Sequence, residues 1–313
     1  FVLSFGDAPS VPKKIGALPS FDLNLEHPIR RLPVFSICKN SDFYDILFPF
    51  SLLHHGFIER GICKKLQEIP WESRVSKLST RFSTSRFATS RWLHENEPPS
   101  HSPRATYAKI SDKDGKDIDI KFVNIPTDLA REIGLSRADY GQAYRTPFLD
   151  KFKYKYLFTV DGNGYQSSFK NIARGGSLIF KGNTFDNGAK ATFEHWYSAL
   201  FEDYHLIGIH NSSDIRQKLM WAREHDIESK MITRRMGAKV EQLLSKDYIQ
   251  CYLYRLLLSY ADLVQYSACF ETSISSNKIQ RLVFDDKFKE KVKFMGKSNP
   301  DKDNFLEWCL HDT

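Results

Sequence analysis

Apolar residues gather in short runs separated by polar turns over much of the chain. Runs of this length predict strands at Phe1–Phe5, Pro33–Ile37, Asp45–Pro49, Tyr156–Val160 and Leu178–Phe180. From about residue 80 to about residue 210 strand signals alternate with helical ones, which indicates βα units and a largely parallel sheet. An amphipathic helix is predicted over Gly61–Ser79, with a break at Pro70-Trp71.

The C-terminal part of the chain carries apolar residues at helical spacing. Ser212-Ser213-Asp214 is a good N-cap cluster for the first of three helices. The three apolar stripes are Ile215, Leu219 and Ala222; Ile232, Met236, Val240 and Leu243; and Ile249, Tyr252, Leu256, Tyr260 and Leu263. Stripes with this period are typical of helix faces that pack into a core, and we expect all three to do so.

The length of 313 residues leaves room for two domains, each with its own core. Apolar residues make up 41% of the chain, which suits a globular protein and argues against disorder. No apolar run approaches the roughly 18 residues that a membrane-spanning helix needs. Because the chain opens inside the run Phe1–Phe5, we expect further N-terminal sequence, including any targeting segment or membrane anchor, to precede it.

The net charge is +7, and much of the excess lies near the C-terminus. A positive excess suits either an anionic partner or a solvated surface. The basic residues concerned are Lys278, Arg281, Lys287, Lys289, Lys291, Lys293, Lys297 and Lys302. No nucleic-acid-binding motif accompanies them, so we interpret the segment as solvated surface and expect no nucleic-acid partner.

The five cysteines are odd in number and lack CxxC spacing, which argues against zinc and against a dense disulfide framework. One or two disulfides remain compatible with the sequence. The single Asn-X-Ser sequon, Asn211-Ser212-Ser213, is compatible with a secretory compartment.

The segment Lys155–Lys181 carries the strongest chemical signal. An apolar strand ends at Asp161-Gly162-Asn163-Gly164, a polar turn follows, and a second apolar strand begins after Gly175-Gly176-Ser177. A buried strand followed by a glycine-rich turn and a short helix presents backbone N–H groups to a phosphate. A turn that merely needs glycine for positive φ is the structural alternative.

Five ordered blocks of the chain resemble glycosyltransferase family 90, which contains the Rumi-type protein O-glucosyltransferases and the fungal capsule-associated xylosyltransferases. The blocks are Phe1–Pro12, Pro33–Pro49, Phe82–Arg91, Lys155–Lys181 and Tyr248–Tyr266. No single block is diagnostic, and the resemblance rests on their order and spacing over nearly the whole chain. The Asp-Gly-Asn-Gly form of the loop is more similar to fungal members than to animal ones.

The resemblance implies an α/β protein of GT-B architecture, with two facing Rossmann-like domains and the active site in the cleft between them. It implies an acceptor-side domain at residues 1–75 and a UDP-sugar-binding domain at residues 76–265. The basic segment at residues 266–313 is then expected to pack back toward the first domain.

The activity implied is transfer of a sugar from a UDP-sugar donor to a hydroxyl of a glycan or glycoprotein acceptor, with inversion at the anomeric carbon. Xylose is the first sugar expected and glucose the second. No metal or other cofactor is expected. The compartment implied is the lumen of the endoplasmic reticulum or Golgi, with membrane contact only through an N-terminal anchor outside this sequence.

Inversion in one step needs a general base that takes the proton of the acceptor hydroxyl as it attacks. In the family this base lies in an Asp-X-Pro turn, which falls on Asp7; from the residues alone, Asp7 is a turn or cap acid before Pro9. Asp45 is the rival carboxylate. It precedes an apolar run, where a helix cap is favoured over catalysis, and the resemblance adds a supporting role near the cleft.

For the donor, the family's contacts map onto Ser85, Arg91 and the turn 163–168, with Arg86 as the alternative arginine. Arginine suits a diphosphate because its fork makes two charge-assisted hydrogen bonds. Many members have an arginine where this chain has Ser168, so either Lys170 supplies the charge or the diphosphate rests on Arg91 and backbone N–H groups. The residues expected to bind the donor are Ser85, Arg86, Arg91, Gly162, Asn163, Gly164, Tyr165, Gln166, Ser167, Ser168, Lys170 and Glu194.

Three further features have competing interpretations. Glu194 either holds the ribose hydroxyls, as a carboxylate often does in GT-B enzymes, or is an exposed helix acid. The pairs Asp112/Asp114 and Asp117/Asp119 have a spacing seen in metal sites, but we interpret the run as a hydrophilic hairpin turn. The serine at position 168 leaves open a catalytically silent glycan- or nucleotide-binding protein of the same fold.

Overall fold

The structure is a computed structural model that describes residues 2–3, 34–39, 45–49, 65–66, 68–83, 103–113, 115–123, 125–135, 147–161, 165–166, 168–182 and 196–263. The chain divides into two compact units, residues 1–245 and residues 246–313. The first unit holds two parallel sheets, and the described part of the second is a helix.

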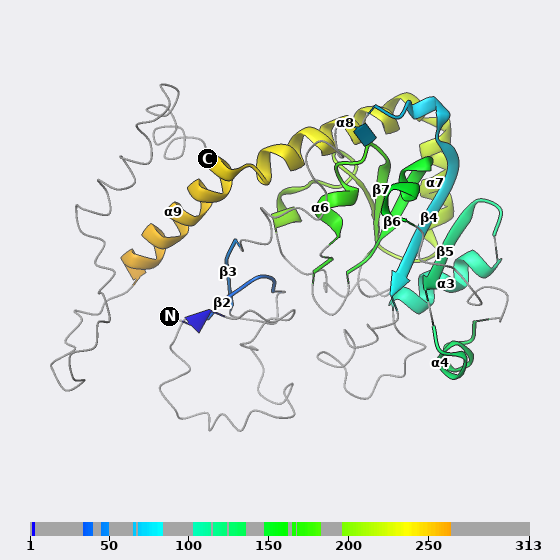
Figure 1. Cartoon of the computed structure of the whole chain (residues 1–313), viewed down its shortest axis with the longest axis horizontal. Coiled ribbons are helices and arrows are strands. Elements are labelled where there is room, and N and C mark those ends of the chain that lie inside the picture. The colour runs from blue at the N-terminus through cyan, green and yellow to red at the C-terminus, as the bar shows by residue number, and fades with distance from the viewer. Residues whose placement is uncertain are drawn as a thin grey trace. The chain divides into compact units, whose positions relative to one another are not determined.

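The larger sheet has five parallel strands in the order β5-β4-β6-β7-β8 (Figure 1). The strands are β4 (Val75–Ser83), β5 (Ile118–Val123), β6 (Tyr154–Thr159), β7 (Leu178–Gly182) and β8 (Ile207–Ile209). This order, with the first strand between the second and the third, is that of one common doubly wound sheet. The predicted α/β fold with a largely parallel sheet is therefore confirmed.

The helix predicted over Gly61–Ser79 is wrong in its C-terminal half. After a single 3-10 turn, η3 (Trp71–Ser73), the chain enters β4 at Val75. Because β4 is hydrogen-bonded to β5 on one side and to β6 on the other, pairing with residues far along the chain outweighs the local helical pattern.

One face of the five-stranded sheet is apolar and packs against helices α3 (Pro103–Lys113) and α7 (Asp214–Glu224). Alternate residues of every strand point to this face. The helix α4 (Thr127–Glu132) adds Ala130 to the same core. The core side chains that are fully buried include Tyr107, Phe122, Tyr156, Phe158 and Phe180.

The opposite face of this sheet, here called the polar face, carries buried polar residues beside the apolar Leu157 and Ile179. Ser79 and Arg81 of β4 and Lys181 of β7 occupy positions that alternate with the apolar ones, and Ser79 and Lys181 are buried. Residues of α6 (Phe169–Ile172) and of the 3-10 helix η5 (Phe148–Lys153) line a pocket together with Ser79 and Arg81. These two short helices therefore lie over the polar face.

The turn that connects α6 to β7 depends on two glycines. A Cβ at Gly175 would overlap the ring of Phe152, so only glycine fits against that ring. Gly176 has a φ of 78°, a conformation that glycine adopts without strain. These two glycines therefore allow the chain to turn from α6 into the apolar strand β7.

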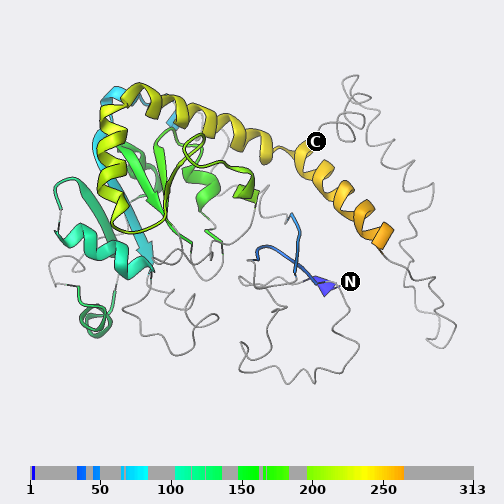
Figure 2. The ribbon, with the colours of Figure 1, turned by 180° about the vertical axis from the view of Figure 1, so that it is seen from behind.

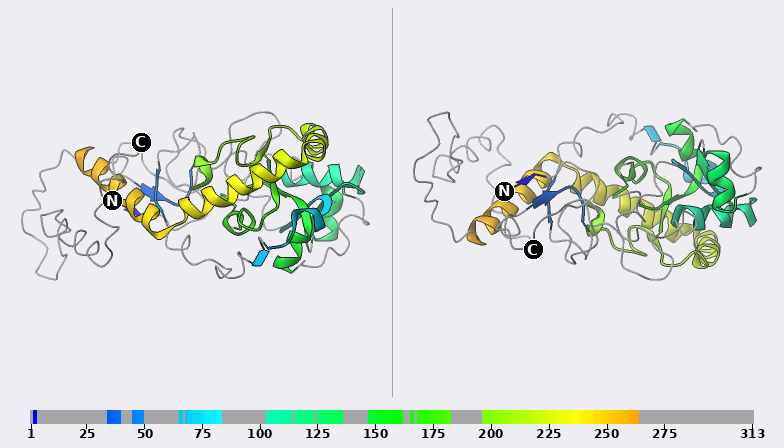
Figure 3. Two further views of the ribbon diagram at one scale, coloured as in Figure 1. Left: turned by 90° about the horizontal axis from the view of Figure 1, so that it is seen from above. Right: turned by 90° about the horizontal axis from the view of Figure 1, so that it is seen from below.

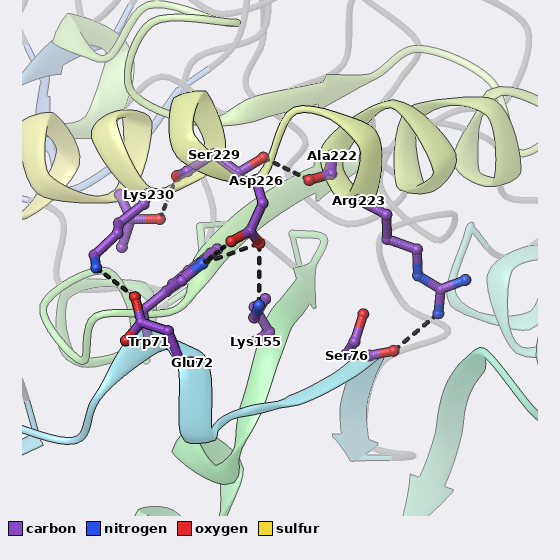
Figure 4. Close-up of polar contacts among 10 residues, drawn as sticks. Trp71, Glu72, Ser76, Lys155, Ala222, Arg223, Asp226, Ser229 and Lys230 are labelled. Atoms are coloured by element: carbon purple, nitrogen blue, oxygen red, sulfur yellow. Dashed lines mark hydrogen bonds and ion pairs between the residues drawn. The ribbon is translucent and has the colours of Figure 1, made fainter.

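Polar contacts tie the amino ends of the strands to helix α8 (Asp226–Leu243), as Figure 4 shows. Asp226 accepts hydrogen bonds from Trp71 Nε1 and from Lys155 Nζ, each at 3.0 Å. In Figure 1, α8 runs past the ends of the strands that are opposite the arrowheads, and Figures 2 and 3 show the same helix from behind and from above. These contacts lie at the amino ends of the strands, here called the amino edge of the sheet; the opposite end is the carboxyl edge.

The smaller sheet has three parallel strands, β1 (Val2–Leu3), β2 (Val34–Ser36) and β3 (Ile46–Leu47), in that order. Among the described residues, no strand pairs across the two sheets. Asp45, which is only 1% exposed, directly precedes β3, so the helix cap expected there is wrong. The predicted domain boundaries stay predictions.

The stripes in the first two C-terminal helices are confirmed, because their residues are buried in α7 and α8. In α9 (Lys246–Leu263) the stripe is only partly a core face, since Ile249 is buried while Tyr252 is 40% exposed. Cys251 of α9 is disulfide-bonded. Within the described part of the chain, no helix combines the length and the apolar character needed to cross a bilayer.

Candidate functional site

The strand order identifies the edge of the five-stranded sheet where a ligand is expected. The chain leaves β4 to form β5 on one side, and then returns across the sheet to form β6 on the other side. In open α/β sheets, ligands bind outside the carboxyl ends of the strands where the order reverses in this way. Here this switch point lies between the ends of β4 and β6.

Both segments predicted to bind the donor follow these two strands along the chain. Residues 84–91, which contain Ser85 and Arg91, come directly after β4. Residues 162–168 begin three residues after Thr159, the last residue of β6. Most of the predicted site residues lie outside the described residues and stay predictions. They are Asp7, Ser85, Arg86, Arg91, Gly162, Asn163, Gly164, Ser167 and Glu194.

Gln166 and Ser168 are the predicted donor residues whose geometry the structure gives in most detail. Gln166 Nε2 donates a hydrogen bond to Ser168 Oγ at 2.8 Å. From the first turn of α3, Arg104 Nη2 lies 3.4 Å from Gln166 Oε1. A buried arginine that follows β4 in the chain therefore reaches the turn that follows β6. Tyr165, the neighbour of Gln166, is half-buried.

Gln166 and Ser168 also line a small pocket on the polar face of the sheet. Its volume is about 40 Å³, which is room for a few water molecules or for one small polar group rather than for a nucleotide. The lining residues are Ser79, Thr80, Arg81, Lys151, Tyr154, Leu157, Phe158, Gln166, Ser168 and Ile172. The pocket thus contains hydroxyl, amide and cationic groups.

Two cations face this pocket. Arg81 Nη2 lies 2.7 Å from Asp119 Oδ2 and forms an ion pair with it. Lys151, from η5, is half-buried, and burial together with the charge of Arg81 lowers the pKa of its ammonium group. Sequence analysis missed both Lys151 and Arg104; the alternating lysines before the strand at Tyr154 were the signal available for the first.

Lys170 and Lys181 are held away from the solvent near the same turn. Lys170 lies in α6 and is 6% exposed, and burial followed by the charge of Arg174 lowers its pKa. It is not among the described residues that line the pocket. Lys181 Nζ of β7 lies 2.8 Å from Asp161 Oδ1, which anchors the first residue of the glycine-rich turn.

Of the four aspartates considered for a metal, Asp117 and Asp119 face arginines, whereas the side chains of Asp112 and Asp114 lie outside the description. Asp117 Oδ1 accepts a hydrogen bond from Arg223 Nη2 at 2.8 Å, and Asp119 is paired with Arg81. The hairpin expected here is wrong, because the turn joins helix α3 to strand β5, which lies parallel to β4. Within the described residues, no group of three or more His, Cys, Asp or Glu is placed to hold a metal ion.

Several characterised proteins are similar to this chain in sequence. It is 27% identical to protein O-glucosyltransferase 3 of Homo sapiens over 271 residues, which cover 84% of this chain and 46% of that protein. It is 25% identical to protein O-glucosyltransferase 2 of Danio rerio over 273 residues, covering 84% and 47%. For protein O-glucosyltransferase 1 of Rattus norvegicus the identity is 24%, covering 75% and 58%. The chain thus spans about half the length of these relatives.

Solved structures give weaker likenesses. A glycosyltransferase from Rickettsia africae has a TM-score of 0.40 and 10% identity, covering 75% of this chain and 64% of that one. Sucrose-phosphate synthase from Thermosynechococcus elongatus has a TM-score of 0.39 and 9% identity, covering 72% and 53%. Similarity at this level carries no argument about this chain.

The family assignment rests on the sequence as a whole. Residues 1–307 match the family described as Glycosyl transferase family 90, and this match spans nearly the whole length of 313 residues. The relatives named above agree with it. This chain belongs to glycosyltransferase family 90.

Proposed function

We propose that this chain transfers a sugar from a UDP-sugar to a hydroxyl of a glycan or glycoprotein acceptor, with inversion at the anomeric carbon. The observation that carries the proposal is the reversal of strand order between β4 and β6. The two predicted donor segments, 84–91 and 162–168, follow these strands along the chain, as ligand-binding segments of open α/β sheets do. Membership of glycosyltransferase family 90 supports the same activity.

Glucose is the donor sugar that we now propose first, with xylose second. Xylose was expected first from the fungal form of the glycine-rich turn. The relatives named above are protein O-glucosyltransferases, and this favours UDP-glucose as the first donor to test. Both proposals keep the same nucleotide and the same diphosphate leaving group.

Asp7 is the general base in this proposal. The base takes the proton of the acceptor hydroxyl while that oxygen attacks the anomeric carbon and the bond from carbon to the diphosphate breaks. Asp7 comes four residues after the end of β1, whereas its rival Asp45 stands at the amino end of β3 and is buried. Ligands of parallel sheets gather at the carboxyl ends of the strands, which favours Asp7 over Asp45.

The substitution Asp7→Asn tests this role, because it keeps the shape of the side chain and removes its basicity. We expect turnover to fall roughly 100-fold or more, in line with typical general-base contributions, while the affinity for UDP changes little. Release of UDP from UDP-glucose and from UDP-xylose, with a panel of glycan and glycoprotein acceptors, gives the measurement.

Asp128→Asn is the matched control, since Asp128 is an exposed acid on α4 and should leave turnover unchanged. Near-normal turnover of Asp7→Asn would reject Asp7 as the base, and Asp45 would be tested next. A chain that binds UDP but releases none from either donor with any acceptor would instead favour the catalytically silent alternative.

We further propose that the chain works in the lumen of the secretory pathway. The disulfide at Cys251 supports this, because disulfides persist in oxidising compartments. Fractionation of cells that express the complete protein tests the proposal, and recovery in the cytosol alone would reject it.

A further inference from the structure

The pocket on the polar face of the five-stranded sheet brings two cations together. Arg81 comes from β4 and Lys151 from η5, and both line the pocket with Gln166 and Ser168. The Arg81 charge is close enough to make protonation of Lys151 less favourable. A like charge nearby disfavours the protonated form of Lys151, and an anion beside the lysine would favour that form again.

Only one of the two cations has its charge balanced by a described residue. The Arg81 guanidinium donates to Asp119 Oδ2 at 2.7 Å, and to the backbone oxygens of Thr80 and Asp119 at 2.8 and 2.9 Å. Within the described part of the chain, no carboxylate forms an ion pair with Lys151. Its Nζ instead lies 5.4 Å from the centre of the Phe148 ring.

This arrangement leaves a partly desolvated positive charge at the pocket. Moving an ammonium group out of water costs free energy unless an opposite charge or hydrogen bonds compensate. The other polar groups of the pocket are hydroxyls and an amide, which carry no charge and so do not neutralise the Lys151 ammonium group. They can, however, donate hydrogen bonds to an anion that Lys151 binds. An anionic ligand would supply the missing charge.

The polar side chains of the pocket can complete the binding of such an anion. Because Ser168 Oγ accepts its hydrogen bond from Gln166, its own hydroxyl hydrogen remains available to donate to a ligand. Ser79 lines the same pocket and adds a second hydroxyl. The volume of about 40 Å³ gives room for one small polar group, such as a phosphoryl group.

We propose that this pocket is a phosphoryl-binding subsite in which Lys151 is the principal cation, and that it receives a phosphoryl group of the nucleoside diphosphate. Naming the ligand as UDP rests on the proposed function, since the turn that supplies Gln166 and Ser168 is the predicted donor turn. Charge-assisted hydrogen bonds from Lys151 Nζ and Ser168 Oγ hold the phosphoryl oxygens. Lys151 then also stabilises the diphosphate as it leaves.

Binding measured by calorimetry with UDP, uridine and pyrophosphate tests the subsite. Lys151→Met keeps the aliphatic stem and removes the charge, so we expect the dissociation constant for UDP to rise about tenfold or more. Uridine lacks the phosphoryl groups, and its affinity should change less than about twofold. Lys153→Met is the matched control, because Lys153 is an exposed lysine of the same 3-10 helix and should leave UDP affinity unchanged.

Acetylation of the unmodified protein gives a second measurement that needs no variant. Saturating UDP or pyrophosphate should slow the acetylation of Lys151, read by mass spectrometry, several-fold more than that of Lys153, and uridine should not. Unchanged acetylation of Lys151 at saturating UDP would overturn the subsite, as would a folded Lys151→Met variant with unchanged UDP affinity.

The two proposals fail in different ways. If the chain binds no UDP, the proposed function is contradicted. In that case, protection of Lys151 by pyrophosphate would still support the phosphoryl subsite, and absence of that protection would overturn the subsite. A chain that binds UDP with no dependence on Lys151 leaves the proposed function standing and overturns the subsite.

Discussion

At the scale of single residues, the polar face of the five-stranded sheet is held by buried charge pairs. Lys181 Nζ lies 2.8 Å from Asp161 Oδ1, and the two side chains are 9% and 0% exposed. Removal of one partner of such a pair leaves the other charge buried without its counter-ion. Because Asp161 opens the glycine-rich turn, this pair also fixes where the predicted donor turn begins.

Lys181→Met should therefore lower the free energy of unfolding by about 3 to 5 kcal/mol, the cost typical of breaking a buried ion pair. Urea denaturation followed by circular dichroism measures it. The double variant Lys181→Met/Asp161→Leu should recover much of this loss, because neither charge then remains buried alone.

Lys218→Met provides the matched control. Lys218 pairs with Asp203 at 3.4 Å, but these side chains are 31% and 62% exposed, so we expect a loss below about 1 kcal/mol. Equal losses for the two lysine variants would show that the Lys181 pair contributes no more than a surface pair.

At the scale of elements, the connection from the 3-10 helix η6 (Trp196–Ala199) to β8 is organised around a buried histidine. His205 is 5% exposed, and its Nδ1 accepts a hydrogen bond from the Phe201 backbone N–H at 3.0 Å. Burial, followed by the charges of Lys239 and Arg235, lowers the pKa of His205. Folding therefore favours the neutral form of this ring.

The sign of the pH dependence follows from this lowered pKa. As the pH falls through about 6.5, the unfolded chain takes up a proton at this position, whereas the folded chain takes it up only at a lower pH. Between that pH and the lowered pKa of the folded state, the fold should lose up to about 1.4 kcal/mol of stability per pH unit from His205 alone.

His205→Asn retains an acceptor near the position of Nδ1 and cannot titrate. We expect its free energy of unfolding to fall less than that of the natural sequence between pH 7.5 and pH 5.5, as measured by urea denaturation at each pH. An identical pH dependence for the two proteins would mean that His205 is not held neutral by the fold.

Elements that depend on neighbouring residues could be predicted from the sequence, whereas those that depend on distant residues could not. Helix α7 begins at Asp214, within the predicted N-cap cluster, and β6 and β7 contain the apolar runs on either side of the glycine-rich turn. Hydrophobic period is local, so the sequence predicts it, whereas the Ser213 side chain makes no capping hydrogen bond to α7. The insertion of β4 between β5 and β6 depends on pairing across the chain, and no local pattern reports it.

The candidate site shows the same division. Gln166 and Ser168 were predicted from the turn and its resemblance to the family. The contact of Arg104 with Gln166 depends on the order of the strands. That Lys151 and Ser168 line one pocket depends on the short helices over the polar face. These neighbours are far apart in sequence, which is why the residues supplied by α3 and η5 were missed.

At the scale of the whole molecule, we expect the two edges of the five-stranded sheet to have different roles. The amino edge is closed by contacts from α8, with Asp226 bonded to Trp71 and Lys155 (Figure 4). The predicted donor segments follow the strands at the carboxyl edge. The proposed function requires the nucleotide to bind at the carboxyl edge, while the contacts with α8 hold the amino edge.

Hydrogen–deuterium exchange with and without saturating UDP tests this account most directly, because it reports both whether the nucleotide binds and where. We expect UDP to slow exchange in peptides that cover residues 84–91 and 162–170, while peptides that cover residues 68–75 and 226–232 at the amino edge stay unchanged. Protection confined to the amino edge, or no protection of either carboxyl-edge segment at saturating UDP, would contradict the account.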